Sequence, residues 1–301
     1  MDVLGQCLSE RTMETIKNTY QSVLTIAGSD SGGCAGIQAD IKSISACGAY
    51  AASVITATTA QNTVGVTDIH AIPIAHLKKQ MDAVFSDIQF GAVKIGMLHS
   101  ADVIAAVEEK LVQYNAPQIV LDPVMVATSG DQLIDNTAVD RLKKLLTKAT
   151  LITPNIPEAT ILMGTPIDAT NITEAATAIG EQFQTSVLLK GGHLSNTDTL
   201  VDVLYHYPEK TVHEIQNPKI ATNHTHGTGC SLSSSIAAFL CLGYDLETAV
   251  RKGCAYIHEA IIQGKDLVLG KGNGPINHFH LKPSKTDVNY NSLCKTVKHG
   301  C

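Results

Sequence analysis

A glycine-rich turn placed ahead of an apolar stretch is the part of this sequence best suited to chemistry. Residues Thr225–Ser233 read THGTGCSLS. Gly227 and Gly229 can adopt backbone conformations that are closed to other residues, so successive N–H groups can converge where a helix begins. Such a turn forms an anion hole, and the helix dipole behind it favours phosphate or the charge on a transferring phosphoryl group.

Cys230 follows this turn directly and would open the helix. The positive field of a helix N-terminus lowers the pKa of a thiol, which would let Cys230 act as a thiolate and accept a proton from a substrate hydroxyl. A cysteine here can also be a small buried residue at the start of an apolar helix. The residue types alone leave these two interpretations open.

Two acidic residues and a lysine can complete a phosphate site. Asp122 follows the apolar run IVL, and Glu158 lies three residues after Asn155 in the segment NIPE. Together the two carboxylates can hold a hydrated Mg²⁺. Lys190 ends another apolar run, where its ammonium can meet phosphate oxygens. Each also has an ordinary interpretation. Asp122 can be a turn residue before proline, Glu158 can compensate the dipole of a helix in its first turn, and Lys190 can extend into solvent.

Other nucleotide and metal motifs are absent from the sequence. There is no GxxxxGK[ST] segment, and Gly28–Gly36 (GSDSGGCAG) lacks the GxGxxG spacing of a dinucleotide site, which disfavours P-loop and Rossmann cofactor binding. His224 with His226 and His278 with His280 have HxH spacing, but no further residues at motif spacing complete a zinc set.

Short apolar runs alternate with longer segments of helical period, which predicts parallel strands with crossover helices on both faces of a sheet. The predicted strands are VLTIAG, AASVITAT, AVKIGM, QIVLDP, LITPN and SVLLKGG, and the predicted helices cover 35–48, 74–85, 101–114, 137–147, 174–183, 230–242 and 246–263. Two later runs, TLVDVLYHY and TVHEIQ, predict an antiparallel hairpin at the sheet edge. Ligands bind beyond the carboxyl ends of parallel strands, so the residues after each run are the site candidates.

Length and composition favour one large α/β domain. The chain has 301 residues, 44% hydrophobic and 17% charged, enough apolar material for a sizeable core. No repeat or low-complexity linker divides it. We expect a domain over 22–280, an N-terminal flank over 1–21 and a polar, aperiodic C-terminal tail over 281–301.

Charge and cysteine usage limit the partners and the compartment. The net charge is −6 without a long basic run, which disfavours nucleic acid and anionic membrane surfaces and leaves a small molecule as the expected partner. Eight cysteines are scattered without a CxxC pair, as in a reduced protein. No apolar run resembles a signal peptide or a membrane span, so we expect a soluble cytoplasmic protein.

The sequence resembles the hydroxymethylpyrimidine and phosphomethylpyrimidine kinases of thiamine biosynthesis, within the ribokinase superfamily. The resemblance is carried in order by LTIAGSDSGGCAGIQADIKSISACGAYAASVITATTAQNTVGV, VKIGML, VLDPVMVATSGDQL, LITPNIPEA, LLKGGHL, NHTHGTGCSLSSSIAAFL and GKGNGPINHFH. It implies a ribokinase-like three-layer α/β/α sandwich with a mostly parallel sheet and a small edge flap. It also implies a homodimer that uses ATP and Mg²⁺.

The resemblance assigns roles to residues. It implies an anion hole at Gly227, Thr228 and Gly229 with Cys230 as the catalytic base, where many sugar-kinase relatives have aspartate. Residues in the position of the pyrimidine pocket are Gly28, Ala35, Asp40, Gln61, Met97 and Val124. The ATP and metal positions fall on Asn155, Lys190, Thr228 and Lys271 for ATP, and on Asp122 and Glu158 for Mg²⁺. Cys34 and His224 depart from the family pattern, which usually has glycine or alanine and asparagine there.

The resemblance implies a kinase that phosphorylates 4-amino-5-hydroxymethyl-2-methylpyrimidine and then its monophosphate. Gln61 suits the aminopyrimidine, since its amide can donate to a ring nitrogen and accept from the adjacent amine. A pyridoxal or pyridoxine kinase on the same scaffold is the alternative. A non-catalytic binder of a phosphorylated vitamin precursor, or a hydrolase with Cys230 as nucleophile, would belong to other classes; the hydrolase lacks a Cys/His/Asn signature.

Overall fold

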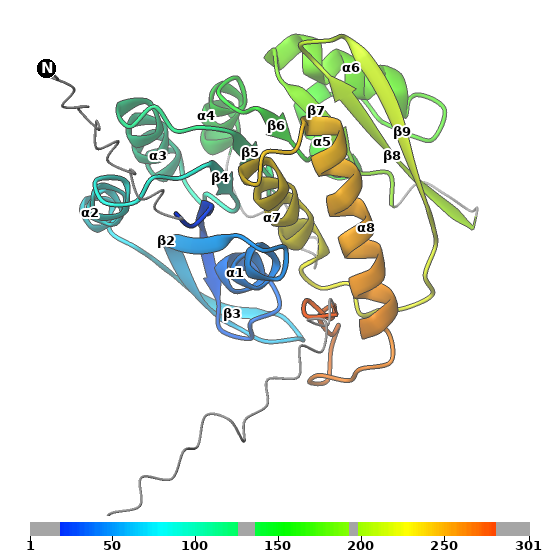
Figure 1. The fold of residues 1–301 in the computed structure, drawn as a ribbon, viewed down its shortest axis with the longest axis horizontal. Helices are drawn as coiled ribbons and strands as arrows, with labels where there is room; N and C mark the ends of the chain where they lie inside the picture. Colours follow the sequence, from blue (N-terminus) through cyan, green and yellow to red (C-terminus); the bar gives the residue numbers. More distant parts are fainter. Residues whose placement is uncertain (1–18, 126–135, 193–197, 281–301) are drawn as a thin grey trace, which may run out of the picture.

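Nine strands form one sheet in the order β3-β2-β1-β4-β5-β6-β7-β8-β9, and helices cover both of its faces (Figure 1). The computed structural model describes residues 19–125, 136–192 and 198–280. The predicted C-terminal tail and all but 19–21 of the predicted N-terminal flank lie outside these residues. No helix in the described part of the chain is both long enough and apolar enough to cross a bilayer.

The helices and strands follow the predicted alternation closely. The strands are β1 Ser22–Asp30, β2 Tyr50–Gln61, β3 Val66–Ala71, β4 Ala92–Ile95, β5 Ile119–Leu121, β6 Leu151–Ile152, β7 Ser186–Leu189, β8 Thr199–His206 and β9 Thr211–Pro218. The helices are α1 Gly36–Ala46, α2 Ile74–Phe85, α3 Ala101–Gln113, α4 Asn136–Leu146, α5 Ile156–Met163, α6 Ile172–Phe183, α7 Thr228–Cys241 and α8 Leu246–Gly264.

The central strands are buried on both sides because their residues supply two separate cores. Leu121 and Ile152 belong to the core beneath α2 to α6, whereas their neighbours Val120 and Leu151 belong to the core beneath α1, α7 and α8. Successive side chains of a strand point to opposite faces, so a short apolar run can serve both layers. This arrangement confirms the predicted three-layer α/β/α sandwich.

The two sheet edges are antiparallel. The predicted hairpin is confirmed as β8 and β9, with β8 pairing antiparallel to β7. At the other edge, β2 runs beyond β1 and pairs with β3 from Ala57 to Gln61, which forms the expected flap. The sequence did not predict β3, because all six of its residues are exposed and no buried face gives it an alternating pattern.

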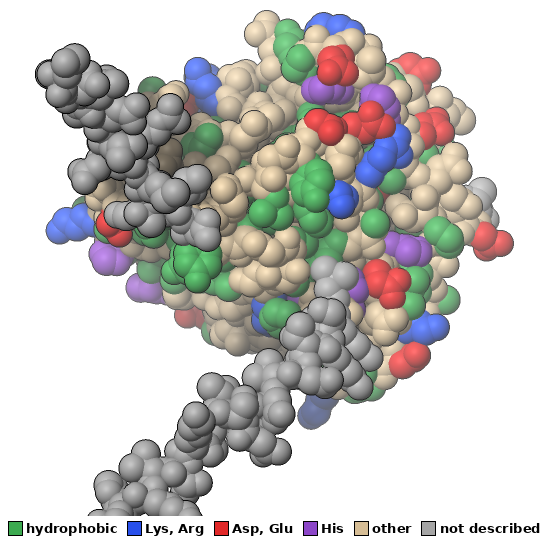
Figure 2. Space-filling model, in the orientation of Figure 1, with side chains coloured by type: hydrophobic (Ala, Val, Ile, Leu, Met, Phe, Trp, Pro, Cys, Tyr) green, Lys and Arg blue, Asp and Glu red, His purple; other side chains and the backbone are tan. Residues whose placement is uncertain are grey.

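Helix α7 lies between α1 and α8 on the face turned toward the viewer in Figure 1. Figure 2 shows that this face carries charged side chains of both signs rather than a patch of one sign. Glu247 accepts from Arg251 at 2.8 Å and lies 3.3 Å from His213 of β9, which ties the start of α8 to the sheet edge.

Candidate active site

The carboxyl ends of β5, β6 and β7 bring a carboxylate, a hydroxyl and an ammonium together. Asp122 Oδ1 accepts from Thr153 Oγ1 at 2.9 Å and from Lys190 Nζ at 2.9 Å. Asp122 is buried, and Asp122 and Lys190 follow β5 and β7 directly, as their sequence positions predicted. The buried ion pair needs these added hydrogen bonds to offset the desolvation of both charges.

Glu158 supplies a second buried carboxylate at the same end of the sheet. It closes a capping box at the start of α5: Glu158 accepts from the Asn155 N–H at 2.8 Å, and Asn155 Oδ1 accepts from the Glu158 N–H at 2.9 Å. Burial raises the pKa of Glu158 to about 7, and the Asp122 carboxylate adds to this, while Lys190 opposes it. The three side chains therefore form one electrostatic unit.

This unit fits a hydrated Mg²⁺. Two carboxylates face a single ammonium, and oxygen ligands from one or two carboxylates are the usual protein contribution to magnesium sites. Asp122 and Glu158 would hold the ion, as predicted. A cation there would also oppose the burial and the Asp122 repulsion that raise the Glu158 pKa.

The glycine turn meets this unit from the other side. Gly227 caps α7 with φ +84°, and a Cβ at this position would overlap the carbonyl oxygen of Cys34. A Cβ on Gly229 would lie 3.4 Å from Lys190 Nζ and 3.5 Å from Asp122 Oδ2. The first turn of α7 thus starts against the charged group, and its N–H groups have no acceptor within the helix. The Thr228 N–H already has an acceptor outside the helix, since it donates to Thr225 O at 3.3 Å.

Cys230 lies in the first turn of α7, but its pKa moves opposite to the predicted direction. Burial raises the pKa of the Cys230 thiol to about 11, and the carboxylates of Asp40 and Asp122 raise it further. Lys94 and the Gly36 N–H at the start of α1 act in the opposite direction. The prediction of a lowered pKa was wrong for the ligand-free protein, because it considered the helix dipole and not the burial or the nearby carboxylates.

Asp40 lies beneath the site rather than in it. Its side chain is fully buried, and its carboxylate accepts from Lys94 Nζ at 2.7 Å, Thr25 Oγ1 at 2.6 Å and Ser234 Oγ at 2.7 Å. Both oxygens are therefore used by the protein, and the structure does not bring Asp40 to an open pocket. Sequence reasoning missed Lys94, although a lysine inside the four-residue buried strand AVKI was a signal of a paired internal charge.

The other predicted pocket residues gather around the carboxyl ends of β1, β2 and β4. A Cβ on Gly28 would lie 2.8 Å from Met97 Cε, so this glycine makes room for the methionine. Ala35 precedes α1 and donates its N–H to Asp30 at 2.8 Å. The Gln61 amide nitrogen lies 3.3 Å from His226 Nε2, and Gln61 Oε1 accepts from Thr59 at 3.0 Å.

Val124 and Lys271 complete the predicted set. Val124 is partly buried and its N–H donates to Asp122 O at 2.8 Å, which places it beside the charged unit. The exposed Lys271 lies in a loop whose backbone N–H groups at 271 and 272 donate to Thr63 Oγ1 in the flap turn. The structure therefore places the Lys271 backbone against the flap, and its assignment to ATP stays a prediction.

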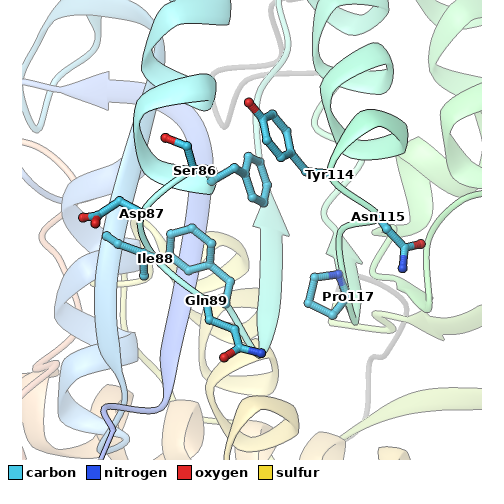
Figure 3. Close-up of a pocket in the computed structure, with 9 residues that line it drawn as sticks. Ser86, Asp87, Ile88, Gln89, Tyr114, Asn115 and Pro117 are labelled. Atoms are coloured by element: carbon cyan, nitrogen blue, oxygen red, sulfur yellow. The ribbon is translucent and has the colours of Figure 1, made fainter.

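A separate pocket lies at the other end of the sheet. It measures about 470 Å³ and is formed by segments that precede β4 and β5, at the amino ends of these strands (Figure 3). It is lined by Phe85, Ser86, Asp87, Ile88, Gln89, Phe90, Tyr114, Asn115 and Pro117. Its single acidic side chain and its aromatic rings offer no phosphate or metal chemistry comparable to that at the opposite end of the sheet.

Comparison with known proteins gives the family. The model of the family described as phosphomethylpyrimidine kinase matches residues 30–277, which include every candidate residue above except Gly28. The chain belongs to the phosphomethylpyrimidine kinase family. The hydroxymethylpyrimidine/phosphomethylpyrimidine kinase of Rhizobium meliloti is 46% identical over 260 residues, covering 85% of this chain and 96% of that protein.

Solved structures of kinases share the fold. The phosphomethylpyrimidine kinase of Clostridium difficile is 42% identical with a TM-score of 0.71, over 80% of this chain and 99% of that chain. The pyridoxal kinase of Bacillus subtilis, solved as an ADP complex, is 30% identical with a TM-score of 0.79, over 86% of this chain and 98% of that chain. The predicted ribokinase-like fold is confirmed. Three longer thiamine biosynthesis proteins also match, and the chain spans about a third to a half of their length.

Proposed function

We propose that this protein transfers the γ-phosphoryl group of ATP to the hydroxymethyl group of 4-amino-5-hydroxymethyl-2-methylpyrimidine and then phosphorylates the monophosphate to the diphosphate. The observation that carries the proposal is the contact of the α7 glycine turn with the Asp122 and Lys190 pair. It joins an anion hole to an ion pair that fits phosphate and Mg²⁺. Membership of the phosphomethylpyrimidine kinase family supports it.

Lys190 and the start of α7 would stabilise the phosphoryl group in transfer. Phosphoryl transfer passes through a loose transition state whose charge spreads over the transferred oxygens, so positioned cations and N–H donors provide most of the catalysis. The Lys190 ammonium lies close to Gly229, so one phosphate can contact both the ammonium and the backbone of the glycine turn. Mg²⁺ held by Asp122 and Glu158 would neutralise phosphate charge. Asn155 and Lys271 are proposed to contact the nucleotide.

Cys230 is proposed to take the proton from the substrate hydroxyl. Its thiol must first lose its own proton, and with a pKa of about 11 only a small fraction is thiolate near pH 7. A loose transition state demands little of the base, so this small fraction can support turnover. The buried Lys94 ammonium favours the thiolate electrostatically.

The pyrimidine ring is proposed to bind between Met97 and Gln61. The amide of Gln61 can donate to a ring nitrogen while accepting from the exocyclic amine. Gly28, Ala35 and Val124 would border the ring. We propose that Asp40 acts on this pocket indirectly, since its carboxylate holds the start of α1 and the first turns of α7 in place.

A pyridoxal kinase is the second candidate, favoured by the TM-score of 0.79 to the Bacillus subtilis enzyme. Sequence identity ranks this candidate second: the chain is 30% identical to the Bacillus subtilis pyridoxal kinase and 46% identical to the Rhizobium meliloti protein. A precursor-binding protein without activity would have no use for an ion pair at the anion hole. A hydrolase with Cys230 as nucleophile is disfavoured because the sequence carries no Cys/His/Asn signature.

Product analysis tests the proposal. The protein is incubated with Mg-ATP and with hydroxymethylpyrimidine, its monophosphate or pyridoxal, and products are identified by mass. The mono- and diphosphates of the pyrimidine, strongly reduced for Cys230→Ala, are expected. A product formed from pyridoxal and from neither pyrimidine would show that the protein is the second candidate, a pyridoxal kinase. Tight binding with no product from any substrate would exclude the kinase.

Three further features belong to the same proposal. We propose Mg²⁺ as the metal, a homodimer as the assembly and the cytoplasm as the compartment. The described cysteines are all unpaired, as expected in a reducing compartment. The flap carries exposed Val64, Val66 and Ile69, an apolar surface that a second copy could cover. Light scattering on the purified protein measures the mass in solution and tests the dimer.

A further inference from the structure

Three side chains with metal-binding atoms meet at the rim of the proposed pyrimidine pocket. A carboxylate oxygen of Asp30, the sulfur of Cys34 and a ring nitrogen of His226 all lie within 4.8 Å of one another. Asp30 and Cys34 are buried, and the His226 side chain is 13% exposed. None of these three residues has a role in the phosphoryl transfer described above.

The loop after β1 holds the first two groups together. The Asp30 carboxylate accepts three backbone N–H groups, from Gly32 at 2.8 Å, Cys34 at 2.9 Å and Ala35 at 2.8 Å. The chain between 31 and 35 therefore wraps around this carboxylate and returns the Cys34 thiol to it. Lys42 fixes the same loop by donating to Gly33 O at 2.8 Å. Two of the three donor groups are fixed before any ligand arrives.

A separate segment delivers the imidazole. His226 precedes Gly227, whose lack of a side chain lets the backbone approach the carbonyl of Cys34. The His226 N–H donates to Gly274 O at 3.2 Å, which anchors the segment on its other side. His226 Nε2 then lies 4.0 Å from Asp30 Oδ2. Thus three separate backbone segments converge on this point.

Sulfur, imidazole nitrogen and carboxylate oxygen together suit a borderline-soft cation better than Mg²⁺. Tetrahedral zinc with ligand bonds of about 2.0–2.3 Å separates its ligand atoms by about 3.3–3.8 Å. The observed spacings need closure by about an ångström or less, which side-chain rotation can supply. Three protein ligands would leave a fourth position for water.

We propose that Asp30, Cys34 and His226 form a binding site for a thiophilic divalent cation such as Zn²⁺, and that the bound ion inhibits the kinase by breaking the contact that positions Gln61 in the pyrimidine pocket. The Cys34 thiol gives its proton to solvent when the sulfur coordinates the ion. The site is distinct from the Mg²⁺ position at Asp122 and Glu158. The inhibition, unlike the binding, rests on the proposed function.

Gln61 connects the ion to the pocket. His226 Nε2 lies 3.3 Å from the Gln61 amide nitrogen, so in the ligand-free protein its lone pair can accept from Gln61. That lone pair cannot serve the ion and Gln61 together. Coordination would break this contact, and the Gln61 amide that is proposed to read the pyrimidine ring would lose its fixed position. Inhibition should therefore be competitive with the pyrimidine and not with ATP.

Cobalt absorption tests the binding without any assay of activity. The protein is titrated with Co²⁺ in a background in which Cys7, Cys294 and Cys301 are serine, and the near-ultraviolet band of a cobalt–thiolate bond is followed. We expect the band to saturate at one equivalent of Co²⁺, and we expect Zn²⁺ to displace the bound Co²⁺. Cys34→Ala should abolish the band, His226→Gln should weaken Co²⁺ binding at least tenfold, and Cys230→Ala should leave the band intact.

The opposite pattern overturns the proposal. Absence of the band in the background protein, or its loss in Cys230→Ala with survival in Cys34→Ala, rules out this site. Circular dichroism of each variant checks that it is folded, and Cys34→Ser gives a second probe of the sulfur. In the kinase assay, Cys34→Ala should need at least tenfold more Zn²⁺ for half inhibition. A normal cobalt band in a protein without kinase activity would leave the metal site standing and reject only the proposed function.

Discussion

Lys94 and Asp40 form an ion pair at 2.7 Å in which neither side chain exposes any surface. Thr25 of β1 and Ser234 of α7 donate to the same carboxylate, so the pair connects β1, β4, α1 and α7. Ser234 lies one helical turn after Cys230. The helix that carries the proposed base and the start of α1 are therefore joined through one buried ion pair.

Removing the Lys94 charge should destabilise the protein severely. Breaking a buried pair leaves the partner charge without compensation, so we expect Lys94→Met to lower the free energy of unfolding by about 3–5 kcal/mol. Lys78→Met is the control, because Lys78 pairs with the exposed Glu109 and should contribute less than about 1 kcal/mol. Urea unfolding measures both. Equal effects of the two substitutions would show that Asp40 does not depend on Lys94.

Gly227→Ala should reduce activity through a backbone clash. The new Cβ would overlap the Cys34 carbonyl and would also occupy a left-handed conformation at φ +84°. Gly243→Ala is the matched control, since φ is +89° there but nothing lies within 4 Å of the new Cβ. We expect a loss of about 1–2 kcal/mol of stability without loss of activity for the control. Steady-state kinetics should show at least a tenfold lower kcat for Gly227→Ala alone.

The rate of phosphorylation should rise with pH. A thiol pKa of about 11 means that the thiolate fraction of the free protein grows about tenfold for each pH unit up to that value. We expect kcat/KM for the pyrimidine to climb between pH 7 and 9 without levelling, and the residual rate of Cys230→Ala to stay flat. A plateau near pH 7 in the unmutated protein would mean that a group with a lower pKa takes the proton.

His278 should make the protein less stable in mild acid. The imidazole is buried and its Nε2 lies 3.0 Å from Ser231 Oγ, and burial lowers the pKa of His278 to about 4. The folded state therefore disfavours the proton that the unfolded chain binds near pH 6.5. This contribution to stability is complete above pH 6.5 and is lost as the pH falls toward 4, to a total of about 3 kcal/mol.

The contribution of Glu158 to stability changes with pH in the opposite direction, over an overlapping pH range. Its pKa is raised to about 7, so its stabilising contribution is complete below the unfolded value near 4.5 and is lost as the pH rises toward 7. Comparison of the unmutated protein with His278→Gln isolates the histidine, since glutamine can still bond Ser231. Urea unfolding from pH 4.5 to 7.5 should show a shallower acid-side loss for His278→Gln. Parallel curves would rule out the histidine contribution.

The sequence predicted elements that bury apolar side chains at a regular period. Helix α2 was predicted with its observed bounds, Ile74–Phe85, because its buried positions repeat at helical spacing. Strand β3 was missed because it is exposed along its whole length. Backbone pairing with β2 across a short turn holds it in place, and such pairing leaves no pattern in the side chains.

The sequence also predicted which polar residues follow the strands, but it did not predict their electrostatics. Asp122 and Lys190 meet at 2.9 Å because β5, β6 and β7 are neighbours in the sheet. The direction of the Cys230 pKa depends on burial and on Asp40, Asp122 and Lys94, which come from three other parts of the chain. Asp40 resembled a ligand residue in sequence and proved to be an internal partner of Lys94. Only the folded arrangement distinguishes these roles.

The close approach of Gly227 to the Cys34 carbonyl has a consequence for how a kinase of the proposed specificity could acquire new substrates. The two backbone segments are so close here that no side chain fits between the loop at 31–35 and the start of α7. Insertions or larger turns in residues 31–35 would therefore displace the start of α7, which forms the proposed anion hole. Diversification of the ring specificity is therefore constrained to side chains on other walls, of which Gln61, Met97 and Val124 are the accessible ones.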